Sequence, residues 1–149
     1  MQRYSEDGVR QRRSDFDDTK ALRDRHRLWG YDSPAVDVDA LFAEFTHYQP
    51  IGLVEYKFIV GNLTRAEREV LGHLANDRPS PLPLVLAHYS QDPWCFRAEP
   101  LNEAARRHFD PRGERLTERE WASRWYEIRG EKPKPEMLAA LDNAISTRI

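Results

Sequence analysis

The sequence is poor in cysteine and has no long apolar run. Cys95 is the single cysteine among 149 residues, which excludes an internal disulfide and a cysteine-ligated zinc site. No apolar stretch approaches the roughly 18 residues that a membrane-spanning helix needs, and the N-terminus lacks the apolar segment of a secretory signal. These absences predict a soluble, cytoplasmic protein that has no membrane partner.

Several catalytic signatures are also missing. The chain contains no HxxxH or His-x-Glu pattern, which argues against a zinc hydrolase. It contains neither a Gly-x-Ser-x-Gly elbow nor a Walker-type glycine-rich loop. The net charge is −2, from 23 basic and 25 acidic residues. Nucleic-acid binders are usually basic overall, so binding of that kind would depend on local charge.

The composition is nevertheless sufficient for a packed core. Hydrophobic residues make up 40% of the chain and aromatic residues 11%, and this length suits one domain rather than two. Residues 1–13 carry almost nothing apolar and are expected to form a flexible arm. Residues 14–149 are expected to form a single domain, with C-terminal helices from about residue 117.

The order of apolar periodicities predicts a mixed α/β (α+β) domain, in which helices flank a small central mixed sheet. Residues 36–45 and 51–60 have the β-branched and aromatic enrichment of an antiparallel hairpin. Capping-box patterns begin the helices that follow Thr64 and Thr117. The remaining expected elements are a first helix from 14–18 to 28, strands at 84–89 and 94–99, a short helix at 102–109 and a last helix after Pro135.

Charged residues occur at two-residue spacing on both hairpin strands. Glu55 and Lys57 are two residues apart, as are Asp37 and Asp39, and residues i and i+2 of a strand point to the same face. Aspartate is disfavoured in sheets, and carboxylates that share one face need a compensating positive charge. A divalent cation held by oxygen ligands supplies that charge. The pattern therefore indicates a site for Mg²⁺ or Mn²⁺, although an exposed cross-strand salt bridge would account for the same residues.

The register of the hairpin decides whether the acids meet. A loop with an odd number of residues, centred on Tyr48, would place Asp39 opposite Lys57 and diagonal to Glu55. A two- or four-residue loop without a bulge would place Asp39 on the other face. The functional interpretation therefore predicts an odd-length loop or a β-bulge.

These residues resemble the PD-(D/E)xK nuclease superfamily. The matching segments are Val36-Asp-Val-Asp39 and Gly52-Leu-Val-Glu-Tyr-Lys57, with 15 residues between Asp39 and Glu55. The resemblance covers about residues 17 to 100 and implies a restriction-endonuclease-like core that hydrolyses DNA with Mg²⁺ or Mn²⁺. It implies Asp39 and Glu55 as metal ligands and Lys57 as the residue that orients or activates water. Asp37 shares the face of Asp39 and is the alternative or additional ligand.

Positive charge is concentrated near the N-terminus. Arg23 and Arg27 have i, i+4 spacing on the expected first helix, with His26 between them, so the three could contact phosphates of DNA. A solvated helix face explains the same run of charge. Two other functions stay open: a catalytically inactive module of the same fold that binds nucleic acid or a protein partner, and a scaffold that forms a homodimer through its C-terminal helices. Trp121 and Trp125 have the spacing of a helical core stripe, and His88 is expected to be a partly buried, hydrogen-bonded imidazole.

Overall fold

The computed structural model describes residues 21, 24, 25, 28, 38–59 and 61–146. The chain divides into two compact units, residues 1–37 and 38–149. In the first unit, the four described residues are helical and exposed, which agrees with the helix expected there. The rest of that helix, and the expected boundary near residue 13, lie outside the described residues.

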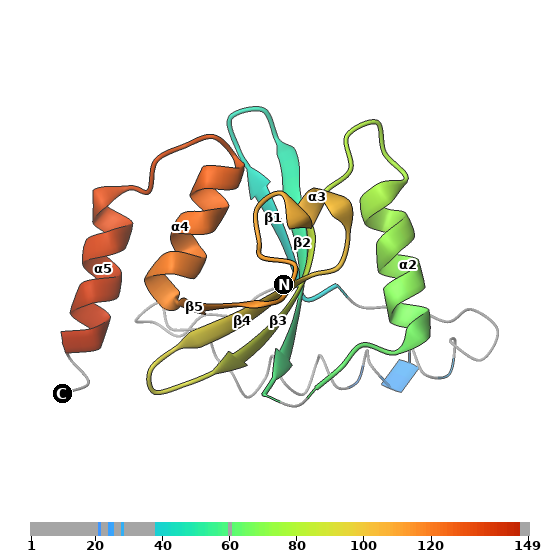
Figure 1. Ribbon diagram of the computed structural model, residues 1–149, viewed down its shortest axis with the longest axis horizontal. Helices are drawn as coiled ribbons and strands as arrows, with labels where there is room; N and C mark the ends of the chain where they lie inside the picture. The colour runs from blue at the N-terminus through green and yellow to red at the C-terminus, as the bar shows by residue number, and fades with distance from the viewer. Residues whose placement is uncertain (1–20, 22–23, 26–27, 29–37, 60, 147–149) are drawn as a thin grey trace. The chain divides into compact units, whose positions relative to one another are not determined.

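The second unit contains a five-stranded mixed sheet and four helices, which confirms the predicted α+β class (Figure 1). The sequence does not predict the fifth strand, Glu114–Thr117, which contains a single buried apolar residue. In the described part of the chain, no helix is long and apolar enough to cross a bilayer. The elements are β1 (Ala40–Glu44), β2 (Gln49–Phe58), α2 (Arg65–Asn76), β3 (Leu84–Ser90), β4 (Cys95–Pro100), α3 (Glu103–Arg106), β5 (Glu114–Thr117), α4 (Glu118–Ile128) and α5 (Pro135–Ser146).

The strands lie in the order β1-β2-β3-β4-β5. Strands β2 and β3 are parallel, and every other neighbouring pair is antiparallel. A parallel pair needs a long crossover, and α2 supplies it between β2 and β3. Both capping boxes form as predicted: the hydroxyls of Thr64 and Thr117 accept hydrogen bonds from the backbone N–H of Glu67 and Glu120.

The register of the β1–β2 hairpin differs from the one that the sequence suggested. Glu44 pairs with Gln49, so the loop has four residues and is not centred on Tyr48. The turn begins early because the carboxylate of Glu44 accepts hydrogen bonds from the backbone N–H groups of Thr46 and His47. A shift in register between Phe42 and Ala43 then adds the expected bulge. Beyond it Ala40 pairs with Val54, which makes Glu55, and not Lys57, the residue opposite Asp39.

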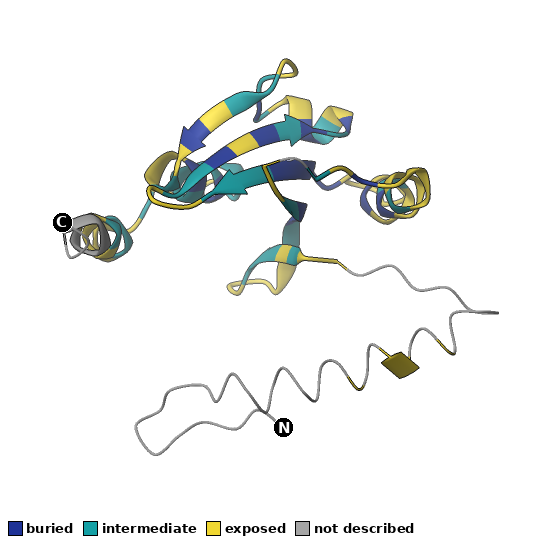
Figure 2. Cartoon of the chain, turned by 90° about the horizontal axis from the view of Figure 1, so that it is seen from below, coloured by how far each residue is buried: buried dark blue, intermediate teal, exposed yellow. Residues whose placement is uncertain are grey.

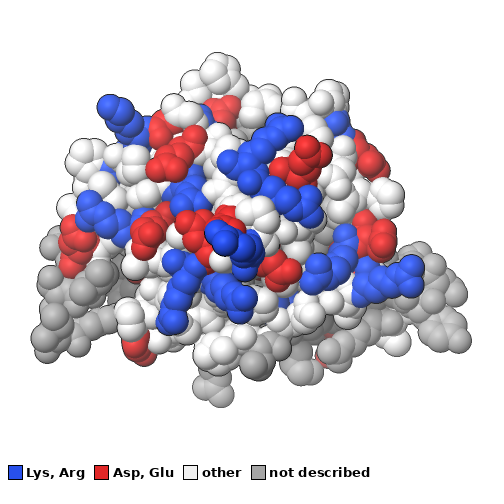
Figure 3. All heavy atoms as spheres, in the orientation of Figure 1, with Lys and Arg blue, Asp and Glu red and all other residues white. Residues whose placement is uncertain are grey.

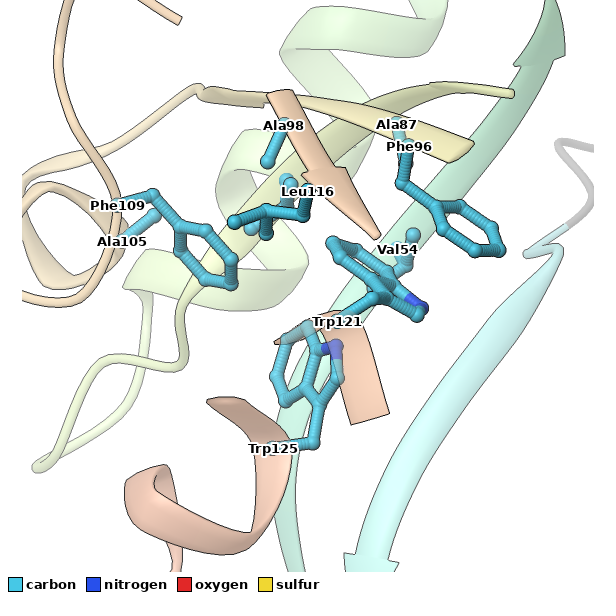
Figure 4. Packing of buried hydrophobic residues seen from close by; sticks show 10 residues of the cluster. Val54, Ala87, Phe96, Ala98, Ala105, Phe109, Leu116, Trp121 and Trp125 are labelled. Carbon is cyan, nitrogen blue, oxygen red and sulfur yellow. The ribbon is translucent and has the colours of Figure 1, made fainter. Parts of the chain in front are cut away.

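One face of the sheet carries an aromatic core under α4. Trp121 and Trp125 of this helix are 5% and 3% exposed and pack against Val54, Phe96 and Phe109 (Figure 4). The rings of Phe96 and Trp121 are stacked at 5.1 Å. The prediction that the two tryptophans form a core stripe is therefore confirmed.

The opposite face is covered in part by α2. Residues 53, 84 and 86 alternate along β2 and β3 with residues of the aromatic core, so they point away from it. These three leucines are buried, as are Leu71 and Ala75 of α2. Figure 2 shows that the strands hold many of the buried residues, whereas much of the surface of α2 is exposed. The face beneath α2 is the one that carries Glu55.

Candidate active site

One hydrogen bond joins Asp39 to Glu55 across the edge of the sheet, and a second joins Asp39 to the neighbouring Tyr56. Asp39 directly precedes β1, whose first residue, Ala40, pairs with Val54, the residue before Glu55. The backbone N–H of Asp39 donates to Oε1 of Glu55 over 3.1 Å. In return, the backbone N–H of Tyr56 donates to Oδ2 of Asp39 over 2.9 Å. The bulge predicted from the sequence thus brings the two acids together, by direct opposition and not on a diagonal.

The carboxyl group of Glu55 is buried and holds its proton unusually tightly. Its residue is 3% exposed, and removal from water raises its pKa from 4.5 to about 7. The neighbouring Asp39 carboxylate raises this pKa further, whereas the backbone hydrogen bond from Asp39 and the charge of Lys57 lower it. The charged form of Glu55 is therefore disfavoured, chiefly by burial and to a lesser extent by the Asp39 carboxylate.

Lys57 lies on the same face of β2 as Glu55, two residues further on. Its Nζ is 3.9 Å from Oε2 of Glu67 on α2, and both side chains are about one-quarter exposed. The other carboxylate oxygen of Glu67 accepts the backbone N–H of Thr64 within the capping box. The capping box at the start of α2 therefore fixes the position of Glu67, which faces Lys57. The long contact distance leaves the ammonium group able to meet a second anion.

The loop between β2 and α2 closes over Lys57. A Cβ atom on Gly61 would lie 2.8 Å from Cβ of Lys57, so a side chain at this position would displace the lysine. The carbonyl oxygen of Gly61 is 2.6 Å from Nε2 of His88, which pairs with Lys57 in the sheet. His88 is half-buried. The prediction of a partly buried, hydrogen-bonded imidazole is confirmed.

The other residues predicted for the site cannot be placed. Asp37, Arg23, His26 and Arg27 lie outside the described residues, so their roles as alternative ligand and as phosphate contacts stay predictions. Across the described ranges, no three His, Cys, Asp or Glu side chains converge as a complete metal-ligand set. The pair formed by Asp39 and Glu55 supplies two carboxylates. Mg²⁺ in proteins is often held by one or two carboxylates, with water and substrate phosphate completing its shell.

A separate hollow opens beside the loop that follows α3. It has a volume of about 600 Å³ and is lined by residues 106–112, among them Arg106, Arg107 and Arg112. Asp39, Glu55 and Lys57 do not line it. The hollow is therefore no part of the acid pair's surroundings.

Glu67 is a member of the site that the sequence did not reveal. It was recognised as the third helical residue of a capping box, a role that it does fill. Its second role follows from the parallel crossover, which brings the start of α2 back over the end of β2. A glutamate in the first turn of a helix that directly follows a Glu-x-Lys strand is the signal that would have found it.

The geometry stands without support from relatives. No family model, no curated protein and no solved structure matches this chain.

Proposed function

We propose that this chain is a metal-dependent nuclease of the PD-(D/E)xK type, which hydrolyses phosphodiester bonds in DNA. The observation that carries the proposal is the contact between Asp39 and Glu55, with Lys57 on the same face of the sheet. Two neighbouring acids and a lysine on one face of the sheet provide the elements of metal-assisted phosphodiester hydrolysis. The proposed cofactor is Mg²⁺ or Mn²⁺.

The donor set fits a hard divalent cation. Each carboxylate of the pair uses one oxygen to accept a backbone N–H, which leaves lone pairs available for a metal. Burial of Glu55 beside a second carboxylate is unfavourable for the charged form, and a cation held between the two acids would offset that cost. When bound, such a cation polarises the phosphodiester and lowers the pKa of a coordinated water.

The chain's own residues then have distinct tasks. Asp39 and Glu55 would hold the cation, and each carboxylate is fixed by a backbone N–H, that of Tyr56 for Asp39 and that of Asp39 for Glu55. Lys57 places a positive charge beside the acids, where it stabilises negative charge on the phosphate and orients the attacking water. Glu67 is a positioning residue, since it meets Lys57 from α2.

A cleavage assay tests the proposal. Purified protein with Mg²⁺ or Mn²⁺ should cut at least one of single-stranded, double-stranded or branched DNA. Glu55→Gln, Asp39→Asn and Lys57→Met should each abolish cutting while the circular dichroism spectrum stays that of the wild type. Glu103→Gln is the matched control, since this exposed glutamate lies on α3. If none of the three substrates is cut, or if Glu55→Gln keeps full activity, the nuclease proposal is refuted.

A second candidate is a catalytically inactive module of the same fold that binds nucleic acid or a protein partner. This candidate is favoured because, among the described residues, no third side-chain ligand joins the two carboxylates. Calorimetry separates the two candidates, because the module would bind no Mg²⁺ or Mn²⁺ through Asp39 and Glu55. A cytoplasmic location and a homodimer stay predictions.

A further inference from the structure

Four strands each contribute one nitrogen-bearing side chain to a single row across the sheet. Lys57 pairs with His88, His88 pairs with Arg97, and Arg97 pairs with Arg115. Residues that are directly opposite in neighbouring strands point to the same face. The row therefore begins at the proposed active site on β2 and continues to the edge strand β5. We refer to these four residues as the basic row.

The alternation of each strand places the basic row on the face away from the aromatic core. Arg97 lies between Phe96 and Ala98, which are both buried in that core, and Arg115 precedes the buried Leu116. On β2, Lys57 follows Tyr56, which packs against the core. The basic row and the pair of Asp39 and Glu55 therefore share one face.

The two arginines of the row differ from the four described arginines that form ion pairs. Arg112, Arg119, Arg124 and Arg129 each form an ion pair with a nearby carboxylate. Arg97 and Arg115 are exposed, and within the described residues neither forms such a pair.

Each of these two arginines has a neighbour that does not neutralise it. The guanidinium group of Arg97 lies against Gly113, where a Cβ would be 3.3 Å from Nε. Arg115 donates from Nε to the sulfur of Cys95 over 3.1 Å. Glu99, two residues after Arg97, is the acid on the same face of β4. It lies in the neighbouring row of paired residues, on the side of Glu55. Figure 3 shows lysine and arginine side chains gathered over the region of β4, β5 and α3, interleaved with acidic ones. The positive charge of Arg97 and Arg115 is thus available to an external anion.

We propose that the exposed part of the basic row, Arg97 and Arg115, is a track that binds the sugar–phosphate backbone of a DNA strand whose path continues toward the acid pair. Neighbouring strands are about 4.8 Å apart, so four strands span about 14 Å. One DNA strand rises about 3.4 Å per nucleotide, so this span corresponds to about four nucleotides. Contacts of this kind position a strand without reading its sequence. The inference rests on the proposed function, because it takes DNA as the substrate of the acid pair.

Fluorescence anisotropy with a labelled single-stranded oligonucleotide, in EDTA, tests the track without any cleavage. Arg97→Ala and Arg115→Ala should each weaken binding about fivefold, as expected for an exposed ion pair, and the double variant more strongly. Each lost phosphate contact should also reduce the slope of log affinity against log salt concentration by about 0.7. Arg119→Ala is the matched control, since this exposed arginine lies on α4 and pairs with Asp142.

The outcomes separate this inference from the proposed function. Binding that depends on Arg97 and Arg115, in a protein that never cuts DNA, would support the track and refute the nuclease. Cleavage with unchanged affinity in both arginine variants would support the nuclease and overturn the track. The track is also overturned if the wild type binds no oligonucleotide, or if Arg119→Ala weakens binding as much as Arg97→Ala does.

Discussion

Replacement of Glu55 by glutamine should change how the stability of the protein depends on pH. Burial raises the pKa of this carboxyl from 4.5 to about 7, so the folded state binds the proton more tightly than the unfolded state. Between these two values the folded state carries more protons, and the free energy of unfolding therefore falls as pH rises. The loss is nearly complete by about pH 8, where Glu55 is largely ionised in both states.

The size of the effect follows from the displacement of the pKa. One pKa unit corresponds to about 1.36 kcal/mol, so the ionised Glu55 costs the fold about 3 kcal/mol. Glutamine has nearly the same shape and does not titrate in this range. Relative to Glu55→Gln, the wild type should thus lose up to about 3 kcal/mol of stability as pH rises from about 4.5 to about 8.

Urea denaturation followed by tryptophan fluorescence measures this difference, because Trp121 and Trp125 are buried in the core. With a urea dependence of about 1–3 kcal/mol per molar, the unfolding midpoints should separate by about 1 M or more. Glu44→Gln is an informative control, since backbone hydrogen bonds lower the pKa of Glu44. For this pair the effect should be opposite: relative to Glu44→Gln, the wild type should lose stability as pH falls. Parallel profiles for the wild type and Glu55→Gln would refute the reasoning about Glu55.

Four further substitutions test core packing, buried hydrogen bonds and helix capping. Gly52→Ala should lower the free energy of unfolding by about 1–3 kcal/mol, because its Cβ would lie 2.7 Å from Cη2 of Trp125. A Cβ at Gly72 would meet open space, so Gly72→Ala should be neutral or stabilising by up to about 1 kcal/mol. Asn102→Ala should cost about 3 kcal/mol, since its buried amide makes four hydrogen bonds that join α2, β3 and α3. Thr64→Ala should cost about 1 kcal/mol through loss of the helix cap. Equilibrium urea unfolding measures all of these changes, and an Asn102→Ala protein as stable as the wild type would contradict the role of that amide.

Much of the sheet could be predicted from local pattern. The β-branched and aromatic residues of β2, the capping box at Thr64 and the short apolar run of β3 each specify their own element without help from distant residues. Strand β5 escaped prediction because its four residues include only one buried apolar side chain, Leu116. Its pairing with β4, which periodicity does not reveal, makes it a strand.

The candidate site was predictable in composition but not in geometry. Spacing on one strand is enough to place Glu55 and Lys57 on a common face. The position of Asp39 depends on where the hairpin turns, and the carboxylate of Glu44 sets that point through hydrogen bonds to the loop. The basic row was invisible for a related reason, since the alignment of Arg97 with Arg115 arises from pairing between strands.

The most direct test of the central claim is a Mn²⁺ titration followed by electron paramagnetic resonance, in which bound Mn²⁺ disappears from the sharp signal of the free ion. The wild type at about pH 8 should show saturable binding, since Glu55 is then largely ionised. Asp39→Asn and Glu55→Gln should each abolish that binding, whereas Glu103→Gln should retain it. Identical titration curves for the wild type and Glu55→Gln would contradict the claim that the acids of β1 and β2 together hold a divalent cation.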